Sequence, residues 1–253
     1  MHKLETQNIT MKFGDETIIR DISIAVDEGE LVSLLGVSGS GKTTLFNCIS
    51  GIYTPVEGKV LLDGKDITGT TGHISYMLQK DLLLPYKTIE DNVALPLVIR
   101  GMSRREARAQ ASAHFGEFGL EGTQKKYPKQ LSGGMRQRAA LLRTYLFSDN
   151  VALLDEPFSA LDTITKGIIH KWYLDVMDKI NLTTVFITHD INEAILLSDR
   201  ICIMTGKPGK IQSEIRIAAP RSRRQDYDLT EEFLEYKCQI TAILDDQKKG
   251  NEE

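Results

Sequence analysis

The sequence predicts an α/β fold with a mostly parallel sheet and an inserted helical subdomain. Short apolar runs such as Leu31–Leu35 and Val151–Leu154 have the composition of buried strands, and helical segments follow them. This alternation favours a parallel sheet with helices on its faces. Residues 88–145 are instead helical in character throughout, which indicates an insertion. A length of 253 residues fits one large domain with a smaller inserted subdomain.

Composition excludes several classes of protein. A net charge of −4 gives no support to nucleic-acid binding. Cys48, Cys202 and Cys238 are isolated, so we expect no disulfide framework or zinc site, and a reducing cytoplasm fits better. We expect no signal peptide and no membrane span, because no stretch approaches the roughly 20 apolar residues that a span needs. Any work at a membrane would then need a membrane partner.

The first half of the chain is predicted to be rich in strands. Alternating or apolar β-rich runs predict strands, and glycine and aspartate mark the turns between them. A helix is predicted from Lys42 to near Gly51. The predicted strands are Thr17–Ile19, Ile22–Val26, Leu31–Leu35, Gly58–Leu62 and Ile74–Leu78.

The second half is predicted to be helical first and then to return to the sheet. Thr88 and Ser103 each precede an acid by three residues, which is typical of a capped helix start, and Gly101 separates the two helices. Further predictions are a helix from about Ile164 to Asn181, the strand Thr183–Thr188 and an amphipathic helix Thr230–Asp245, with a frayed end from Gln247 to Glu253.

These elements predict a single domain with three parts, of which the first is built from two segments of the chain. The α/β core comprises residues 1–87 and 146–220, the helical subdomain residues 88–145 and a C-terminal helical tail residues 221–253. The tail begins with a basic cluster, Arg221, Arg223 and Arg224. This cluster is consistent with contact to a membrane surface, with contact to acids of a second copy, or with a solvated face.

A glycine-rich loop between a predicted strand and a predicted helix carries the clearest chemistry. Its pattern is Gly36-x-x-x-x-Gly41-Lys42-Thr43, a phosphate-binding loop. Glycines allow backbone N–H groups to surround phosphates, and the helix N-terminus adds its positive end. Lys42 is expected to contact the β- and γ-phosphates, and the Thr43 hydroxyl to ligate Mg²⁺. The remaining phosphate-binding residues are predicted to be Ser38, Gly39, Ser40 and Thr44.

Four polar side chains follow predicted strands, at the sheet edge where ligands of α/β proteins bind. Asp155 is placed to hold Mg²⁺ through water, and Glu156 to polarise the attacking water. His189 is placed to contact the γ-phosphate. Gln79 could reach Mg²⁺ or the attacking water, although its residue chemistry alone favours neither that role nor a structural one.

The stretch Leu131–Gln137 lies between these motifs and precedes an Ala/Leu-rich run, Arg138–Leu146. With the phosphate-binding loop and the acids it resembles the ATP-binding-cassette (ABC) ATPases, from about Leu4 to Pro220. The resemblance implies a P-loop ATPase with an N-terminal antiparallel β subdomain. In family order the motifs are Walker A at Gly36–Thr43, the Q-loop Gln79, the signature Leu131–Gln137, Walker B at Val151–Glu156, the D-loop Ser159–Asp162 and the switch His189.

The resemblance implies a head-to-tail homodimer with ATP sandwiched between the copies. Ser132, Gly133 and Gly134 of one copy are then expected to bind the γ-phosphate of ATP held by the other, with Asp162 at the same interface. The alternative for these three residues is a helix N-cap without a ligand. Phe13 occupies the adenine-stacking position, where the family usually has Tyr; it could also be an ordinary core residue.

Three stretches resemble bacterial importer ATPases of the nitrate/sulfonate/taurine type: Leu153–Asp162, Thr188–Ala194 and Lys207–Ile211. Some members of that group serve thiamine-precursor pyrimidines. The resemblance implies contact with integral membrane permease subunits through Gln79–Tyr86, on the cytoplasmic face of the plasma membrane, and an extracytoplasmic solute-binding protein. Leu82–Leu84 could instead be packed core. Alternatives for the whole chain are an exporter ATPase and a soluble ABC protein acting on ribosomes or in DNA repair.

Overall fold

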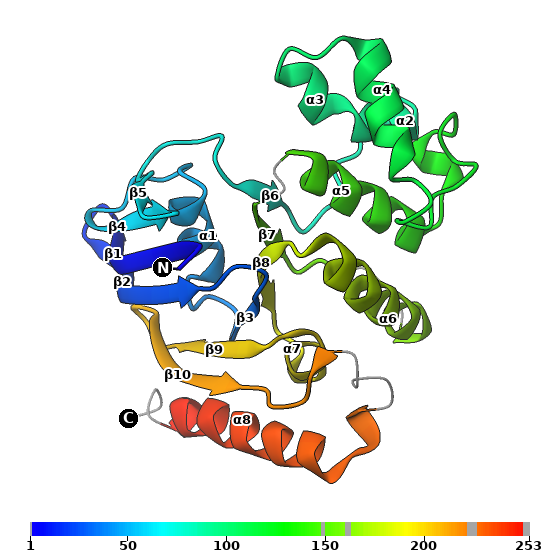
Figure 1. Ribbon diagram of the computed structural model, residues 1–253. Coiled ribbons are helices and arrows are strands. Elements are labelled where there is room, and N and C mark those ends of the chain that lie inside the picture. The colour runs from blue at the N-terminus through cyan, green and yellow to red at the C-terminus, as the bar shows by residue number, and fades with distance from the viewer. Residues whose placement is uncertain (1, 148–149, 160–162, 222–226, 250–253) are drawn as a thin grey trace.

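The computed structural model describes residues 2–147, 150–159, 163–221 and 227–249 (Figure 1). Among the residues singled out above, Asp162, Arg223 and Arg224 lie outside these ranges. Two sheets form the α/β core, and four helices stand to one side of it as a separate group. This arrangement confirms the predicted fold class.

The N-terminal sheet is antiparallel, in the order β2-β1-β4-β5. The prediction of two strands at Thr17–Ile19 and Ile22–Val26 was wrong, because one strand runs through both. Arg20 and Asp21 form an irregularity within it, where Asp21 has a φ of 55°. The bounds are β1 Leu4–Phe13, β2 Glu16–Val26, β4 Glu57–Leu62 and β5 Lys65–Asp66.

The central sheet has the order β10-β9-β3-β8-β7-β6, in which every pairing is parallel except that of β10 with β9. Every residue of β3, β7, β8 and β9 is buried, because helices or the other sheet cover both faces. The bounds are β3 Leu31–Gly36, β6 Ser75–Met77, β7 Val151–Asp155, β8 Thr183–Thr188, β9 Arg200–Thr205 and β10 Lys210–Arg216.

Helix α1 (Lys42–Ile49) lies between the two sheets. Its Leu45 and Phe46 are fully buried in one apolar cluster with residues of β1, β2, β3 and β7. Helix α6 (Thr163–Ile180) and helix α7 (Ile191–Leu197) lie on the central sheet on either side of β8 in the chain. Because α1 begins directly after the phosphate-binding loop, the burial of Leu45 and Phe46 fixes the loop to the sheet.

The helical group comprises α2 (Ile89–Val93), α3 (Leu95–Ile99), α4 (Arg104–Ala113) and α5 (Gly133–Phe147). Both predicted caps are present: Thr88 Oγ1 accepts the Asp91 N–H at 3.2 Å, and Ser103 Oγ accepts the Glu106 N–H at 3.3 Å. The helix predicted from Thr88 is divided in two, since Pro96 lies in the first turn of α3 and has no N–H to continue α2.

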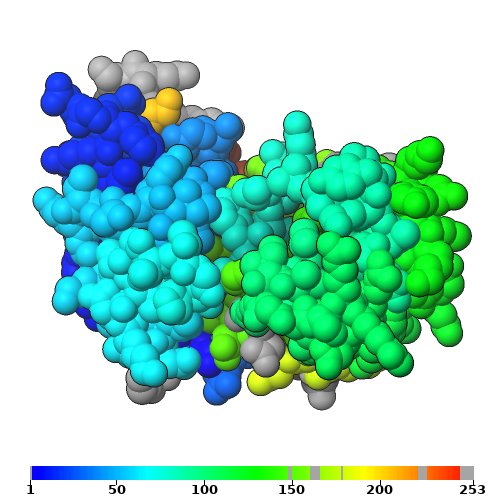
Figure 2. All heavy atoms as spheres, turned by 90° about the horizontal axis from the view of Figure 1, so that it is seen from above, coloured from blue at the N-terminus to red at the C-terminus, as the bar shows by residue number. Residues whose placement is uncertain are grey.

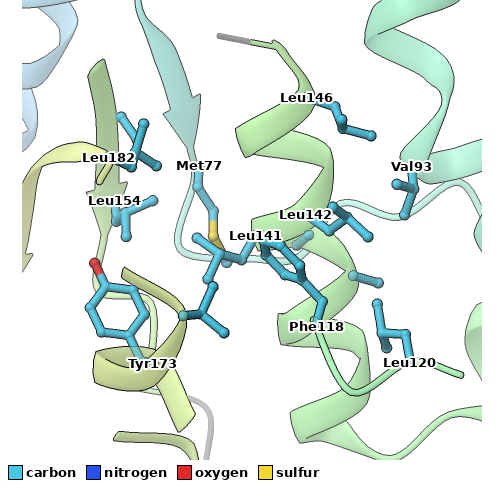
Figure 3. Packing of buried hydrophobic residues seen from close by; sticks show 14 of the residues in the cluster. Met77, Val93, Phe118, Leu120, Leu141, Leu142, Leu146, Leu154, Tyr173 and Leu182 are labelled. Carbon is cyan, nitrogen blue, oxygen red and sulfur yellow. The ribbon is translucent and has the colours of Figure 1, made fainter. Parts of the chain in front are cut away.

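Helix α5 joins this group to the core (Figure 3). Its Leu141 and Leu142 are packed in one cluster with Met77 of β6, Leu154 of β7, Tyr173 of α6 and Phe118. Full burial of each such side chain contributes roughly 1.5–3 kcal/mol. The start of α5, which carries the signature, is therefore placed by packing against the sheet.

The C-terminal segment is held by Arg221, whose role the sequence left open. Its guanidinium donates to the carboxylate of Asp199 at 3.0 Å and to Gly29 O at 2.6 Å. Helix α8 (Glu231–Lys249) packs beside α7. Residues 247–249 of the end that was predicted to fray are the last residues of this helix, and residues 250–253 lie outside the described ranges. Within the described ranges, no helix is both long and apolar enough to cross a membrane.

Candidate active site

The phosphate-binding loop connects β3 to α1 and closes around its own lysine. Gly39 and Gly41 have φ values of 84° and 90°, which are open to glycine at no steric cost. Lys42 Nζ donates to Gly36 O at 2.9 Å and to Val37 O at 2.8 Å. The ammonium is thereby placed under the loop, where phosphate oxygens bound by the backbone N–H groups would meet it.

Two further glycines allow the close packing behind this loop. A Cβ on Gly36 would overlap the carbonyl oxygen of Met204, and a Cβ on Gly209 would overlap that of Ser40. Gly209 lies in the turn between β9 and β10, and its backbone exchanges hydrogen bonds with Ile18 and Arg20 of β2. Sequence reasoning missed Gly209 as a support of the loop, because it is more than 160 residues away along the chain.

Asp155 ends β7 beside the loop. Thr43 Oγ1 donates to its Oδ2 at 3.3 Å, and Tyr76 OH lies 3.5 Å from the same oxygen. A hydroxyl and a carboxylate oxygen are ligands that Mg²⁺ accepts, so the residues present fit this ion. Burial raises the pKa of Asp155 and the charge of Glu156 adds to this, while the hydrogen bond from Thr43 opposes it.

Lys42 shows the complementary effect. Burial lowers the pKa of its ammonium, and the negative charges of Glu156 and Asp155 act in the opposite direction. The site therefore holds two adjacent carboxylates and one buried cation. A polyanionic ligand with a divalent cation would strongly change the electrostatic potential at all three groups.

Glu156 is the centre of the predicted catalytic group. Its Oε2 accepts a hydrogen bond from Gln79 Nε2 at 2.9 Å, and its Oε1 lies 3.1 Å from His189 Nδ1. The structure thus brings together Glu156, Gln79 and His189 from three different strand ends. Gln79 faces Glu156, whereas Thr43 and Tyr76 are the side chains that contact Asp155.

The backbone of Glu156 has an uncommon conformation, with a φ of 46°. Its N–H donates to Ile187 O at 3.0 Å, and its carbonyl accepts from Ser159 Oγ at 3.0 Å. A non-glycine residue in this region costs of order 1–3 kcal/mol and persists only where its surroundings determine it. These bonds direct the carboxylate towards the loop.

A cavity of about 640 Å³ lies over these residues. Phe13, the last residue of β1, does not belong to the described lining of this cavity: it is 47% exposed, with its ring 5.4 Å from that of Tyr53 in an edge contact. Phe13 is therefore not an ordinary core residue, and that alternative is wrong. Sequence reasoning did not predict Tyr53 as its aromatic neighbour. The cavity is lined by Ile18, Ser38, Gly39, Gly41, Lys42, Thr43, Thr44, Asp155, Glu156, Ile187 and His189.

The signature does not contribute to this cavity, since its described lining includes no residue from 131 to 137. Ser132 is exposed and caps α5, with its Oγ accepting the Met135 N–H at 3.3 Å. An exposed helix N-terminus with small residues is open to an anion that comes from outside this chain. The helix N-cap is the structural alternative given for Ser132 in the sequence analysis. It is compatible with a contact to an anion held by a second copy.

The fold and this site define a P-loop nucleoside triphosphatase. Residues 19–159 match the family model described as ABC transporter. The chain is 43% identical over 223 residues to the formylaminopyrimidine import ATP-binding protein ThiZ of Halalkalibacterium halodurans, covering 88% of this chain and 86% of that protein. It is 34% identical over 239 residues to the nitrate import ATP-binding protein NrtD of Synechocystis sp., covering 92% and 90%.

Among solved structures, the dimeric bacterial ABC transporter cassette MJ0796 is 31% identical and covers 86% of this chain and 100% of its own, with a TM-score of 0.72. That cassette is also known in a post-hydrolysis state bound to ADP and Pi. The chain belongs to the ABC transporter family, and it is an ATPase of the ABC type.

Gly209→Ala tests the support of the loop by the β9–β10 turn. The added methyl must displace the backbone at Ser40, and a strain of roughly 1–3 kcal/mol predicts ATP binding about tenfold weaker. A fluorescence titration with a nucleotide analogue measures the affinity. Gly116→Ala is the control, because nothing lies within 4 Å of a Cβ there. Unchanged affinity in a folded Gly209→Ala protein would show that the turn does not shape the loop.

Proposed function

We propose that this chain is the ATP-hydrolysing subunit of a bacterial ABC importer, acting as a head-to-tail homodimer at the cytoplasmic face of the plasma membrane. The observation that carries the catalytic part is the contact of Glu156 with Gln79 and His189 beside the loop. The names of the relatives support import: they are import proteins for formylaminopyrimidine, nitrate and aliphatic sulfonates. Small solutes of these kinds are the proposed cargo class.

In this proposal the residues from Gly36 to Thr44 bind the phosphates of ATP, and Phe13 stacks on the adenine. Thr43 and Asp155 are the residues that would hold Mg²⁺. The ion, when bound, neutralises charge on the β- and γ-phosphate oxygens. Gln79 is proposed to act on the attacking water and the ion from the side of Glu156.

Glu156 is proposed to orient the water for in-line attack on the γ-phosphorus. The water oxygen forms the new bond to phosphorus, the bond to the bridging oxygen of ADP breaks, and the proton of the water passes to Glu156 or to the phosphate released. Both carboxylate oxygens are bonded here, to Gln79 and His189. One of those bonds must therefore be exchanged for a bond to water, and His189 is the residue proposed to turn to the γ-phosphate.

The site of one chain is proposed to be completed by a second copy. Ser132, Gly133 and Gly134 lie at the start of α5 and outside the cavity of their own chain. The positive end of a 15-residue helix favours an anion at this point. Asp162 is proposed to lie at the same interface.

The permease contact is proposed at a second cavity, of about 440 Å³, between the α/β core and the helical group. Figure 2 views the face on which these two parts meet, with residues near 60 in cyan and the helical group in green. The predicted segment Gln79–Tyr86 contributes one side chain, Leu82, which is 51% exposed. Leu83 is buried, so the alternative of packed core is correct for that residue.

Sequence reasoning did not predict the other residues that line this second cavity, the permease groove, because they are far apart in the sequence. Ile52 from the segment after α1, Ile99 of α3 and Phe147 of α5 make it apolar. Arg143 of α5 donates to the carbonyls of Asp81 and Leu82 at 2.6 and 2.9 Å, which holds Leu82 in the groove. An exposed apolar hollow with a fixed loop fits an apolar segment of a partner.

Glu156→Gln tests the catalytic role. The amide keeps the shape of the side chain but is a poor acceptor for the water proton, so turnover should fall at least a hundredfold while ATP still binds. An ATP-bound dimer should accumulate, as measured by size-exclusion chromatography with light scattering. Retained turnover would rule out the assigned role.

Ser132→Arg tests the contribution of the signature to the second copy. A long cationic side chain at the start of α5 blocks the proposed anion contact without touching the cavity of its own chain. Monomer ATP affinity should stay within about twofold, whereas ATP-driven dimerisation in the Glu156→Gln background should be lost. A collapse of monomer binding would contradict the assignment to the partner's site.

Leu82→Arg tests the permease groove. The wild-type chain should co-purify from native membranes with an integral membrane protein and an extracytoplasmic binding protein, and this variant should lose both while keeping ATP binding. Leu234→Arg on α8 is the matched control, since Leu234 is 54% exposed and Leu82 51%. A membrane partner without a binding protein would favour an exporter, and no membrane partner a soluble ABC protein.

A further inference from the structure

A buried polar cluster lies behind His189, away from the nucleotide cavity. Its centre is Glu193 of α7, which is 3% exposed. Glu193 Oε1 accepts a hydrogen bond from Lys166 Nζ at 2.8 Å, and Oε2 accepts one from Thr188 Oγ1 at 2.7 Å. His170 Nε2 lies 3.6 Å from Oε1. None of these four residues lines the cavity.

Glu193 is charged in this environment. Burial raises the pKa of its carboxyl, but His170, Lys166 and Thr188 together outweigh this and bring the pKa to about 2. A buried carboxylate with donors on both oxygens is a strong and fixed acceptor. Thr188 is therefore held in one rotamer by a partner that does not lose its charge at neutral pH.

The Thr188 hydroxyl connects this carboxylate to the backbone around His189. It donates to Glu193 and also accepts the N–H of Asp190 at 3.0 Å. Asp190 Oδ1 in turn caps α7 by accepting the N–H of Asn192 at 2.9 Å. The residues on both sides of His189 are thus fixed, while the His189 side chain is 61% exposed and can turn only about its own bonds.

The same cluster also contacts the loop that carries Glu156. The ring of Phe158, two residues after Glu156, packs edge-on against the His170 ring, with centroids 4.8 Å apart. Phe158 is itself buried. Both partners of the Glu156–His189 contact are therefore anchored on one group of side chains between α6 and α7.

We propose that Thr188 and Glu193 are positioning residues for catalysis, which set the place of His189 opposite Glu156, with Lys166 and His170 holding them there. The proposal rests on the catalytic role proposed for Glu156 and His189. Thr188 and Glu193 act through the backbone of residues 188–190. Small misplacements of a catalytic group are costly, with about 1 Å worth up to a hundredfold in rate.

Thr188→Val is the sharpest test, because it removes the hydroxyl at almost constant volume. We expect kcat for ATP to fall about tenfold, a loss of about 1.4 kcal/mol in transition-state stabilisation, with nucleotide affinity within twofold of the wild type. Thr188→Ser restores the hydroxyl and should recover most of the wild-type kcat. Thr184→Val is the matched control: Thr184 is as buried on the same strand, and its hydroxyl donates to Leu182 O at 3.1 Å, away from the site.

A double-mutant cycle separates positioning from general stability. In a His189→Ala background, Thr188→Val should lower kcat no further, because the group that it positions is absent. A full additional tenfold loss in that background, an unchanged kcat in Thr188→Val, or an equal loss in Thr184→Val would each overturn the proposal. If Thr188→Val does not fold, as judged by circular dichroism, Glu193→Gln is put through the same cycle.

The turnover of His189→Ala distinguishes failure of the proposed catalytic role of His189 from failure of the positioning proposal. If His189→Ala alone retains wild-type turnover, the catalytic role of His189 is wrong and the positioning role falls with it. If His189→Ala loses turnover while Thr188→Val does not, only the positioning proposal is wrong.

Discussion

The parallel register of β3, β8 and β7 is the constraint on which the site depends. Leu35 pairs with Thr188 and Asp155 pairs with Ile187, so these three strands end at one edge of the sheet. The phosphate-binding loop, Glu156 and His189 begin where those strands end. Displacement of a strand by one residue would turn its side chains to the opposite face and separate the group. The complete burial of these strands makes such a displacement costly.

Charge is concentrated where this edge meets the cavity. Asp155 and Glu156 are adjacent, and Lys42 is bonded to carbonyls rather than to either carboxylate. The lysine is thus left under the loop and not neutralised by direct pairing. In this state Glu156 is bonded to Gln79 and His189, so a ligand that attracts either side chain would change the environment of the carboxylate. The site is preorganised in its backbone and adjustable in its side chains.

The helical group and the core are joined by apolar packing, and their polar contacts lie along the same seam. Leu141 and Leu142 of α5 pack with residues of β6 and β7, while Arg143 binds the loop after Gln79. The start of α5 and the loop in the groove therefore have a shared support. Arg143 and Phe147 of the groove and Gly133 and Gly134 of the signature thus belong to one helix.

The sequence by itself determined the chemistry, because the glycine loop, the paired acids and the signature are local patterns with local physical reasons. It predicted which strand ends carry Asp155, Glu156 and His189, since apolar runs followed by polar residues mark the carboxyl ends of buried strands. It missed Gly209, Tyr53 and the cluster around Glu193, and it divided β2 in two. Only the tertiary structure decided the roles of these residues, because each depends on a contact between segments that the fold brings together. These contacts are the packing of Gly209 against Ser40, the edge contact of Tyr53 with Phe13 and the hydrogen bond from Thr188 to Glu193.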